Sequence, residues 1–289
     1  MQSPVDVLHR LARRRAVHRL VAHPRVEWLV ALIKRSGMVR PGRTRFVARE
    51  LLHRRVAVRY RLRTAPGVTV LVRHGTPDVV TLDEVFLTQD YRIPPPAATA
   101  LEAAPGPLRV LDLGANAGYF GAFVLARFPD AKMVGFEPDA ANVAALHETI
   151  AANRAEERWE VVAACAGASD GTVQFVSGAY SLSHLAAART ASVIDGSVGR
   201  VRCVDVFPHL AEADLVKIDI EGGEWEIICD PRFPQTSARA IVLEYHPALC
   251  PGDDPRTTAR QALTGAGFEI VEVWQRADGH GVLWGWRPT

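Results

Sequence analysis

The apolar positions of this chain follow helical spacing at its start and strand-like spacing soon after. Residues 5–35 place apolar side chains three to four positions apart, and Pro24 is expected to separate two helices. A loop is expected around Gly42. Residues 56–63 and 68–73 then alternate or run apolar with β-branched side chains, which predicts a hairpin or two short strands.

Strand and helix patterns alternate through the rest of the chain. The expected helices are 81–91, 97–104, 117–127, 139–153, 222–229 and 255–266, and the expected strands are 109–113, 132–136, 159–164, 214–219, 239–244, 268–274 and 281–286. A turn at Asp170-Gly171 predicts a hairpin from 159–164 to 172–176. The alternation favours an α/β fold with a doubly wound, mainly parallel sheet. Because the last two strands meet at a tight turn, the sheet is expected to end in an antiparallel hairpin, unlike the all-parallel nicotinamide-binding fold.

The strand at 109–113 runs directly into a turn that contains two glycines, Gly114 and Gly118. Ligands of open α/β sheets bind beyond the carboxyl ends of the strands. Gly114 is expected to remove a side chain that would collide with such a ligand, and Gly118 to allow close approach of the backbone. The free N–H groups of the following helix can hold the carboxylate of a methionine moiety.

An acid, Glu137, closes the next strand, 23 residues beyond Gly114. A carboxylate there can accept hydrogen bonds from both hydroxyls of a ribose. Together the turn and the acid predict a site for S-adenosylmethionine and therefore a methyltransferase. A dinucleotide site is disfavoured because the turn has the pattern G-x-N-x-G and not G-x-G-x-x-G. A tight turn without any ligand is the remaining alternative.

Further cofactor candidates lie beside the turn and at the ends of neighbouring strands: Asp112, Asn116, Tyr119, Pro138, Asn142, Ala166, Ser169 and Asp170. Adenine is expected against the end of the third strand, near Ala166, with Ser169 and Asp170 close by. For Asp170-Gly171 a plain hairpin turn is an equal alternative.

Four segments in order resemble the FkbM-type S-adenosylmethionine-dependent methyltransferase family over roughly residues 65–289. The most specific is Lys-Ile-Asp-x-Glu-Gly-x-Glu within 214–224, and the others are 73–78, 110–120 with 136–138, and 243–246. The resemblance implies transfer of a methyl group, usually to oxygen, often on a secondary metabolite, a sugar or a lipid-linked glycan. It also implies that Thr76, Asp78, Glu84 and Tyr91 lie near the cofactor, although Pro77 stands where a small polar residue is expected.

The fold class that follows is a class I methyltransferase: a Rossmann-like, mainly parallel seven-stranded sheet ending in an antiparallel hairpin. A basic helical extension or cap is expected over residues 1–63, and the methyltransferase domain over 64–289, with the cofactor core beginning at about residue 97. The helices of the extension are expected to cover the substrate or to form a homodimer interface, because their apolar stripes need a partner surface.

The candidates for chemistry on the acceptor follow the fourth and fifth expected strands: Asp219, Glu221, Glu244 and His246. Methyl transfer from a sulfonium needs an aligned nucleophile and removal of a hydroxyl proton. Histidine titrates near neutrality, so His246 is a plausible base. Glu224 and His184 are weaker candidates for substrate contact. Alternatives are that Glu224 complements a helix dipole and that Lys217 pairs with a buried acid.

Asp219, Glu244 and His246 could also converge on Mg²⁺, which prefers oxygen ligands and can acidify a hydroxyl. Nothing in their spacing demands an ion, so the sequence-based expectation is a site without metal. S-adenosylmethionine is the one cofactor expected.

Charge is distributed unevenly although the net charge is only +2. Residues 1–63 carry 17 Lys and Arg and three acids, a net charge of +14. Such a segment could clamp nucleic acid, and an RNA methyltransferase is the alternative function. Interleaved aromatic residues that would stack bases are missing, so a small-molecule acceptor is favoured. A binding protein of this fold that has lost its chemistry is a further alternative.

Cysteine spacing and hydropathy indicate the cellular compartment in which the protein is expected. The four cysteines show no CxxC pair, which is typical of a reducing cytosol. No apolar run approaches the length of a membrane span, and no secretion signal is visible. The expectation is a cytoplasmic protein.

Overall fold

The computed structural model describes residues 24–40, 42–52, 55–177, 184–185 and 197–288. The helix expected before Pro24 lies outside these residues. Among the described residues, no helix combines the length and the apolar character needed to cross a bilayer.

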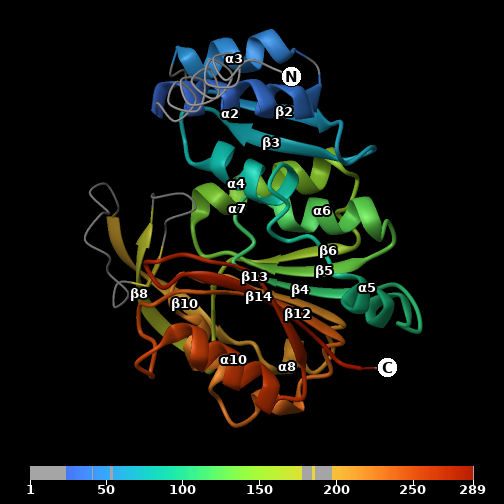
Figure 1. Ribbon diagram of the computed structural model, residues 1–289, viewed down its shortest axis with the longest axis vertical. Coiled ribbons are helices and arrows are strands. Elements are labelled where there is room, and N and C mark those ends of the chain that lie inside the picture. Colours follow the sequence, from blue (N-terminus) through green and yellow to red (C-terminus); the bar gives the residue numbers. More distant parts are fainter. Residues whose placement is uncertain (1–23, 41, 53–54, 178–183, 186–196, 289) are drawn as a thin grey trace, which may run out of the picture.

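A seven-stranded sheet forms the centre of the molecule (Figure 1). Its strands, in spatial order, are β13 (Glu269–Gln275), β14 (Gly281–Trp286), β12 (Ala240–Tyr245), β11 (Leu215–Ile218), β4 (Arg109–Leu113), β5 (Lys132–Phe136) and β6 (Trp159–Val162). All neighbouring strands pair in parallel except at β14, which is antiparallel to both β12 and β13. This order and the single reversed strand are those of a class I methyltransferase, which confirms the expected fold.

Helices cover both faces of this sheet. They are α5 (Pro95–Glu102), α6 (Tyr119–Arg127), α7 (Ala140–Ala152), α8 (Phe207–Leu210), α9 (Glu224–Ile228) and α10 (Pro255–Gly265), with a 3₁₀ turn, η3, at Phe233–Gln235. Side chains of β4 alternate between the faces, as strand geometry requires. Val110 packs in the core with α6 and α7, whereas Leu111 and Leu113 pack in the core with α9 and α10.

A smaller layer lies over α6 and α7, at the top of Figure 1. It contains α2 (Pro24–Met38), β1 (Val39–Arg40), α3 (Arg43–Leu51), β2 (Ala57–Leu62) and β3 (Thr69–Arg73), and it is followed by α4 (Asp78–Phe86). β1, β2 and β3 form one antiparallel sheet, so the expected hairpin of 56–63 and 68–73 is confirmed. The apolar side chains of this layer and of α6 and α7 belong to one continuous core. Helix α3 was not expected from the sequence.

The helix expected over 81–91 begins three residues earlier and ends sooner, at Phe86. Pro77 stands at its N-cap, and just before it the Thr76 hydroxyl accepts a hydrogen bond from the Asp78 N–H at 3.2 Å. Beyond it Gln89 adopts a left-handed backbone conformation, with φ of 58°, which no helix continues through. Tyr91 consequently lies on a loop and not on a helix.

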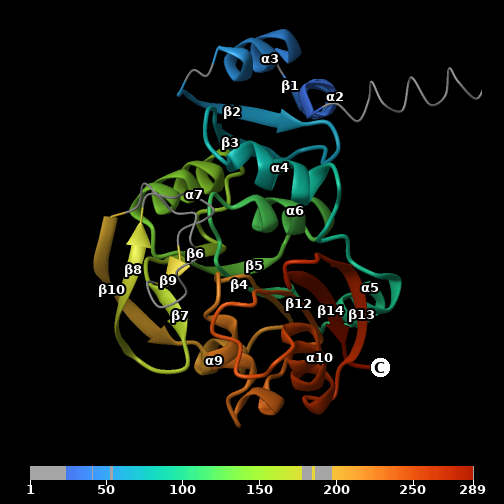
Figure 2. The same ribbon diagram turned by 60° about the vertical axis from the view of Figure 1, so that its left-hand side comes forward.

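A second, four-stranded sheet stands beside the first (Figure 2). Its order is β7 (Cys165–Gly167), β10 (Ser197–Asp205), β8 (Gly171–Ser177) and β9 (His184–Leu185). The expected hairpin between 159–164 and 172–176 is therefore wrong. The chain leaves the central sheet after Val162, β7 runs parallel to β10, and β8 finds a seven-residue antiparallel register with β10. The long strand β10 was absent from the sequence-based expectation.

The indole ring of Trp159, on β6, packs against the backbone of three glycines, which have no side chains to exclude it. A Cβ atom at Gly121 would lie 2.1 Å from its ring, and Cβ atoms at Gly118 and Gly135 would each lie 3.3 Å from it. The indole is 3% exposed. Glycines on α6 and β5 thus create the space for the largest side chain of this region.

Candidate active site

The first pocket lies at the carboxyl ends of β4, β5 and β11, beside the start of β7. It is lined by Gly114, Asn116, Phe136, Glu137, Pro138, Asn142, Cys165, Ala166, Phe175, Asp219, Ile220, Glu221 and Gly223. Several residues expected from the sequence to hold the cofactor are therefore brought together here. Parallel strands place their carboxyl ends at one edge, which is where ligands of such sheets bind.

Glu137 is held on three sides by N–H groups. One carboxylate oxygen accepts from the Asn116 N–H at 2.8 Å, and the other accepts from the Asp139 N–H at 2.9 Å and from the Asn142 amide at 3.3 Å. Burial nevertheless raises the pKa of Glu137 to about 7, against the lowering effect of these donors. A carboxylate offers about four acceptor positions, so the fixed side chain retains capacity for a ligand.

The turn after β4 has a backbone that glycine makes possible. Gly114 has a φ of 84°, and a Cβ atom there would lie 1.9 Å from the Asp219 carbonyl oxygen. The neighbouring chain after β11 thus forbids a side chain at this position. Asn116 is left-handed as well, with φ of 49°, and its side-chain oxygen accepts from the Ala117 N–H. Gly118, at φ of 85°, starts α6 beneath the Leu146 side chain.

The turn between β3 and α4 is tied to this pocket through Arg73. Its guanidinium donates to the buried Asp78 carboxylate at 2.8 Å and to the Asn142 side-chain oxygen at 2.8 Å. Because Asn142 donates in turn to Glu137, a chain of hydrogen bonds joins the upper layer to the first pocket. Asp78 contributes to this chain, whereas the Thr76 hydroxyl is used within its own turn.

A second pocket adjoins the first and shares Gly114, Asn116, Asp219 and Glu221 with it. Its other lining residues are Pro77, Val80, Thr81, Glu84, Val85, Tyr91, Ala115, Tyr119, Phe120, Lys217, Glu244, His246, Arg276 and His280. The sequence-based candidates for acceptor chemistry thus gather in one place. Glu84 lies here, and the charges of Asp219 and Asp90 add to burial in raising the pKa of its carboxyl to about 7.

Tyr91 lies between two of the acids. Its hydroxyl is 2.8 Å from a Glu244 carboxylate oxygen, to which it donates, and 3.3 Å from Asp219. Beneath them the Lys217 ammonium donates to the Gly114 carbonyl oxygen at 2.7 Å and lies 3.2 Å from Asp219 and 3.5 Å from Asp112. The lysine therefore pairs with buried acids, and Asp112 supports it from inside the sheet. Burial raises the pKa of Asp112 although Lys217 opposes the shift.

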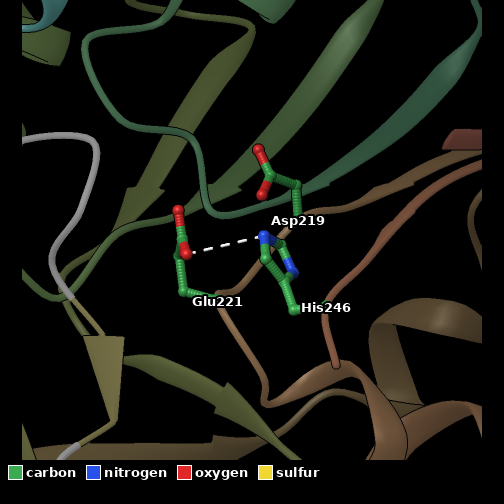
Figure 3. Close-up of side chains that lie close together, drawn as sticks. All are labelled: Asp219, Glu221 and His246. Carbon is green, nitrogen blue, oxygen red and sulfur yellow. Dashed lines mark ion pairs between the residues drawn. The ribbon is translucent and has the colours of Figure 1, made fainter. Parts of the chain in front are cut away.

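His246, Asp219 and Glu221 lie close together (Figure 3). All three line the second pocket, and Asp219 and Glu221 line the first as well. Glu224 is fully buried and lies 3.1 Å from the His246 Nδ1, and it also accepts from the His246 backbone N–H at 2.6 Å. Nε2 of the ring faces Glu221 at 3.5 Å. Glu221 adopts a left-handed backbone with φ of 52°, a strained conformation that recurs at functional sites.

The charge of this cluster shifts its pKa values strongly. Burial by itself lowers the pKa of His246, but its hydrogen bond to Glu224 and the charges of Glu224, Glu221 and Asp219 raise it to about 10. Burial raises the pKa of Glu221 and of Glu244 to about 8 each, although His246 opposes both shifts. In this arrangement the imidazole already carries its proton at neutral pH.

Some expected site residues lie apart from both pockets or use their polar atoms elsewhere. Ser169 and Asp170 are exposed, and Asp170 accepts a hydrogen bond from the Asp205 N–H. Tyr119 lines the second pocket, but its hydroxyl donates to the Leu71 carbonyl oxygen at 2.7 Å. Glu224 acts on His246 and lines neither pocket, and His184 belongs to β9.

Sequence analysis missed Arg276 and His280. Both lie in the turn between β13 and β14. Since β13 is parallel to β12, this turn lies at the same edge as the other carboxyl ends, and the topology could have placed them there.

Comparison with known proteins gave one family match. The sequence model described as "Methyltransferase FkbM domain" matches residues 112–270. A search of curated proteins found no match.

Solved methyltransferase structures are distantly similar. The precorrin-6y C5,15-methyltransferase of Geobacter metallireducens is 14% identical, with a TM-score of 0.38 over 66% of this chain and 87% of that chain. A SAM-dependent O-methyltransferase of Thermotoga maritima is 12% identical, with a TM-score of 0.39 over 66% and 63%. A SAM-dependent methyltransferase of Agrobacterium tumefaciens is 14% identical, with a TM-score of 0.42 over 81% and 70%. The strand order described above, and not these likenesses, defines the fold.

Proposed function

The chain belongs to the FkbM methyltransferase family, and from that premise we propose that it methylates a hydroxyl oxygen of a small molecule with S-adenosylmethionine. The observation that supports this most is the meeting of two pockets at Gly114 and Asp219. One pocket contains a buried carboxylate held by N–H donors, and the other is lined by acids. A cofactor and an acceptor can thus lie side by side, as an in-line transfer requires.

The first pocket fits the cofactor by its own chemistry. Glu137 would accept hydrogen bonds from the ribose hydroxyls, and the turn at 114–118 would bring backbone close to the methionine moiety. Ala166 and Phe175 supply apolar lining for adenine. When bound, the cofactor supplies a methyl group on a positively charged sulfur.

In the second pocket the chain must orient a hydroxyl and accept its proton. We assign proton acceptance to Glu244, because its carboxylate faces the pocket and Tyr91 fixes it at 2.8 Å. Asp219 lies where the pockets meet and would orient the acceptor, with Glu221 and His246 beside it. Lys217 holds Asp219 and the Gly114 carbonyl, so it would position the residues that lie between the cofactor and the acceptor.

Binding of S-adenosylhomocysteine tests the cofactor assignment. Calorimetry should detect binding to the purified protein, and Glu137→Ala should weaken the affinity roughly 10- to 100-fold, because hydrogen bonds to a charged group contribute about 1.5–3 kcal/mol. Glu160→Gln, an exposed carboxylate on β6, is the matched control and should bind as the original protein does. Unchanged affinity in Glu137→Ala would contradict the assignment.

The acceptor class is tested by mass spectrometry of products. Incubation with S-adenosylmethionine and a panel of hydroxylated, amino and RNA substrates should give methyl ethers of small hydroxyl compounds. Methylation confined to nitrogen or to RNA would reject the oxygen-directed proposal.

A further inference from the structure

Three side chains at the junction of the pockets have the composition of a metal-binding set. One ligand atom from each of Asp219, Glu221 and His246 lies within 4.8 Å of the others, and the three side chains point toward one another (Figure 3). They come from the end of β11, the loop after it and the end of β12, so the central sheet fixes their spacing. Two carboxylates and one imidazole form a mixed oxygen and nitrogen set.

The second observation is the way His246 is held. Glu224, 0% exposed, binds Nδ1 at 3.1 Å and the His246 backbone N–H at 2.6 Å, while its other oxygen accepts from the Gly222 N–H at 2.9 Å. A carboxylate behind one ring nitrogen is the arrangement that orients histidine ligands in metal sites. The other nitrogen, Nε2, is 3.5 Å from Glu221, too far for a normal hydrogen bond, and faces the two carboxylates.

The second pocket is also rich in carboxyl groups, whose ionised form a cation at this point would stabilise. Among the described residues, the acids Glu84, Asp219, Glu221 and Glu244 line the second pocket. The Lys217 ammonium is already shared by Asp112, Asp219 and the Gly114 carbonyl, and Arg276 lies 3.9 Å from Glu84. A positively charged sulfonium or amine in the pocket would also compensate the negative charge of these carboxylates. Neither of them, however, would use an imidazole nitrogen directed between two carboxylates.

From these contacts we propose that Asp219, Glu221 and His246 bind a divalent first-row metal ion of the Mn²⁺ or Fe²⁺ class, with Glu224 orienting the histidine. Carboxylates suit Mn²⁺ and imidazole suits Fe²⁺, whereas Mg²⁺ prefers oxygen ligands alone. The ion replaces the proton on the ring. All three residues line the second pocket, so an ion bound there would lower the pKa of an acceptor hydroxyl. The effect of the ion on an acceptor hydroxyl rests on the proposed function, whereas binding of the ion to these three residues does not.

The test is Mn²⁺ binding to the EDTA-treated full-length protein, without cofactor or acceptor. Titration followed by electron paramagnetic resonance should show one saturable site. His246→Asn and Asp219→Asn should each weaken binding at least tenfold, and Glu224→Gln 10- to 100-fold through the lost orientation of the ring. Glu226→Gln, an exposed carboxylate on the same short helix as Glu224, is the matched control and should leave Mn²⁺ binding unchanged.

Two further measurements separate the inference from a folding defect and from the proposed function. Binding of S-adenosylhomocysteine should persist in His246→Asn, because His246 lines only the second pocket. The original protein with Mn²⁺ should show electron spin-echo coupling to an imidazole nitrogen, which needs no variant. Absence of saturable Mn²⁺ binding, absence of nitrogen coupling, or equal binding by the ligand variants would overturn the inference. If the protein bound Mn²⁺ but not S-adenosylhomocysteine, the assignment of the first pocket to the cofactor would be rejected and the metal site would stand.

Discussion

Single residues of the first pocket are fixed by local physical demands. Gly114 is required by the Asp219 carbonyl oxygen and by a left-handed backbone, and Glu137 is fixed by three N–H donors. Both positions were predictable from sequence, because strand, glycine turn and acid follow one another within a short stretch. The predicted reason for Gly114 was clearance for a ligand, whereas the collision found is with a neighbouring strand end. That contact depends on which strand lies beside β4, which local sequence does not encode.

Cofactor affinity should depend on pH through Glu137. Its pKa in the folded protein is about 7, raised from 4.5 by burial, so the ionised fraction grows between pH 6 and 8. Ribose hydroxyls donate to the ionised form, and affinity for S-adenosylhomocysteine should rise roughly tenfold across this window. The stability contribution has the opposite sign: it is greatest below about pH 4.5 and is lost as the pH rises through 7.

Calorimetry at several pH values checks this prediction, and Glu137→Gln is its control. The amide cannot ionise, so the variant should lose this pH dependence. An equal pH dependence in both proteins would assign the effect to other groups.

Substitution at Gly114 should be severe. Gly114→Ala places a Cβ 1.9 Å from backbone at a φ of 84°, so we expect a loss of about 3 kcal/mol or more in the free energy of unfolding. Gly106→Ala is the matched control, because nothing lies within 4 Å of its Cβ and its φ is not left-handed. Urea denaturation of both variants measures the difference, and similar midpoints would contradict the argument.

Elements show where sequence patterns suffice and where they fail. Strands β4 and β5 were predicted to the residue, because their apolar runs are bounded by turn residues. The hairpin at Asp170-Gly171 was wrong because β8 pairs with β10, a strand that begins 20 residues after β8 ends. Alternation of Arg200, Val201, Arg202 and Cys203 was a signal for β10. The strand with which β8 pairs is set by the number of residues that the two strands can align in the folded chain. Local sequence does not contain that information.

The link between β3 and α7 gives a prediction at this scale. Arg73→Met leaves the buried Asp78 carboxylate without its partner, so we expect a loss of about 3–5 kcal/mol in stability. Affinity for S-adenosylhomocysteine should fall too, because Arg73 holds Asn142 and Asn142 holds Glu137.

Arg59→Met is the control for this prediction. Arg59 also joins the upper layer to α7, through Glu148, but both side chains are about half exposed. Its loss should cost less than about 1 kcal/mol. Equal melting temperatures for the two variants would show that burial of the Arg73 pair does not matter.

At the scale of the whole molecule, one continuous core joins the upper layer to one face of the central sheet. Leu32, Phe46 and Tyr60 of that layer belong to the same apolar cluster as Leu146 and Trp159 of the lower part. Helical periodicity indicated that the N-terminal region needs a partner surface, but not which one. The described helix of that region, α2, packs on α3 and α4, and β3 and α4 connect the layer to α6 and α7. These two helices were placed on one face of the sheet only by the topology.

We therefore expect one cooperative unfolding transition for the described residues. Far-ultraviolet circular dichroism and tryptophan fluorescence should give the same melting temperature. Phe46→Ala, which removes a fully buried ring, should lower both temperatures together by a loss of about 3–5 kcal/mol. Leu52→Ala, at a side chain 63% exposed, should change little. Separate transitions for the two probes would show that the layers unfold independently.

The packing of Trp159 against glycines has a consequence for the history of this protein. The indole ring of Trp159 and the glycines restrict one another. A methyl group at position 121 therefore destabilises the fold while the indole is present. A smaller residue at 159 leaves a void, of which a methyl group at 121 would fill a part. The two changes are tolerated together far better than either alone, so the effect of each mutation depends on the other. A change from one packing to the other by single substitutions must therefore pass through a less stable sequence.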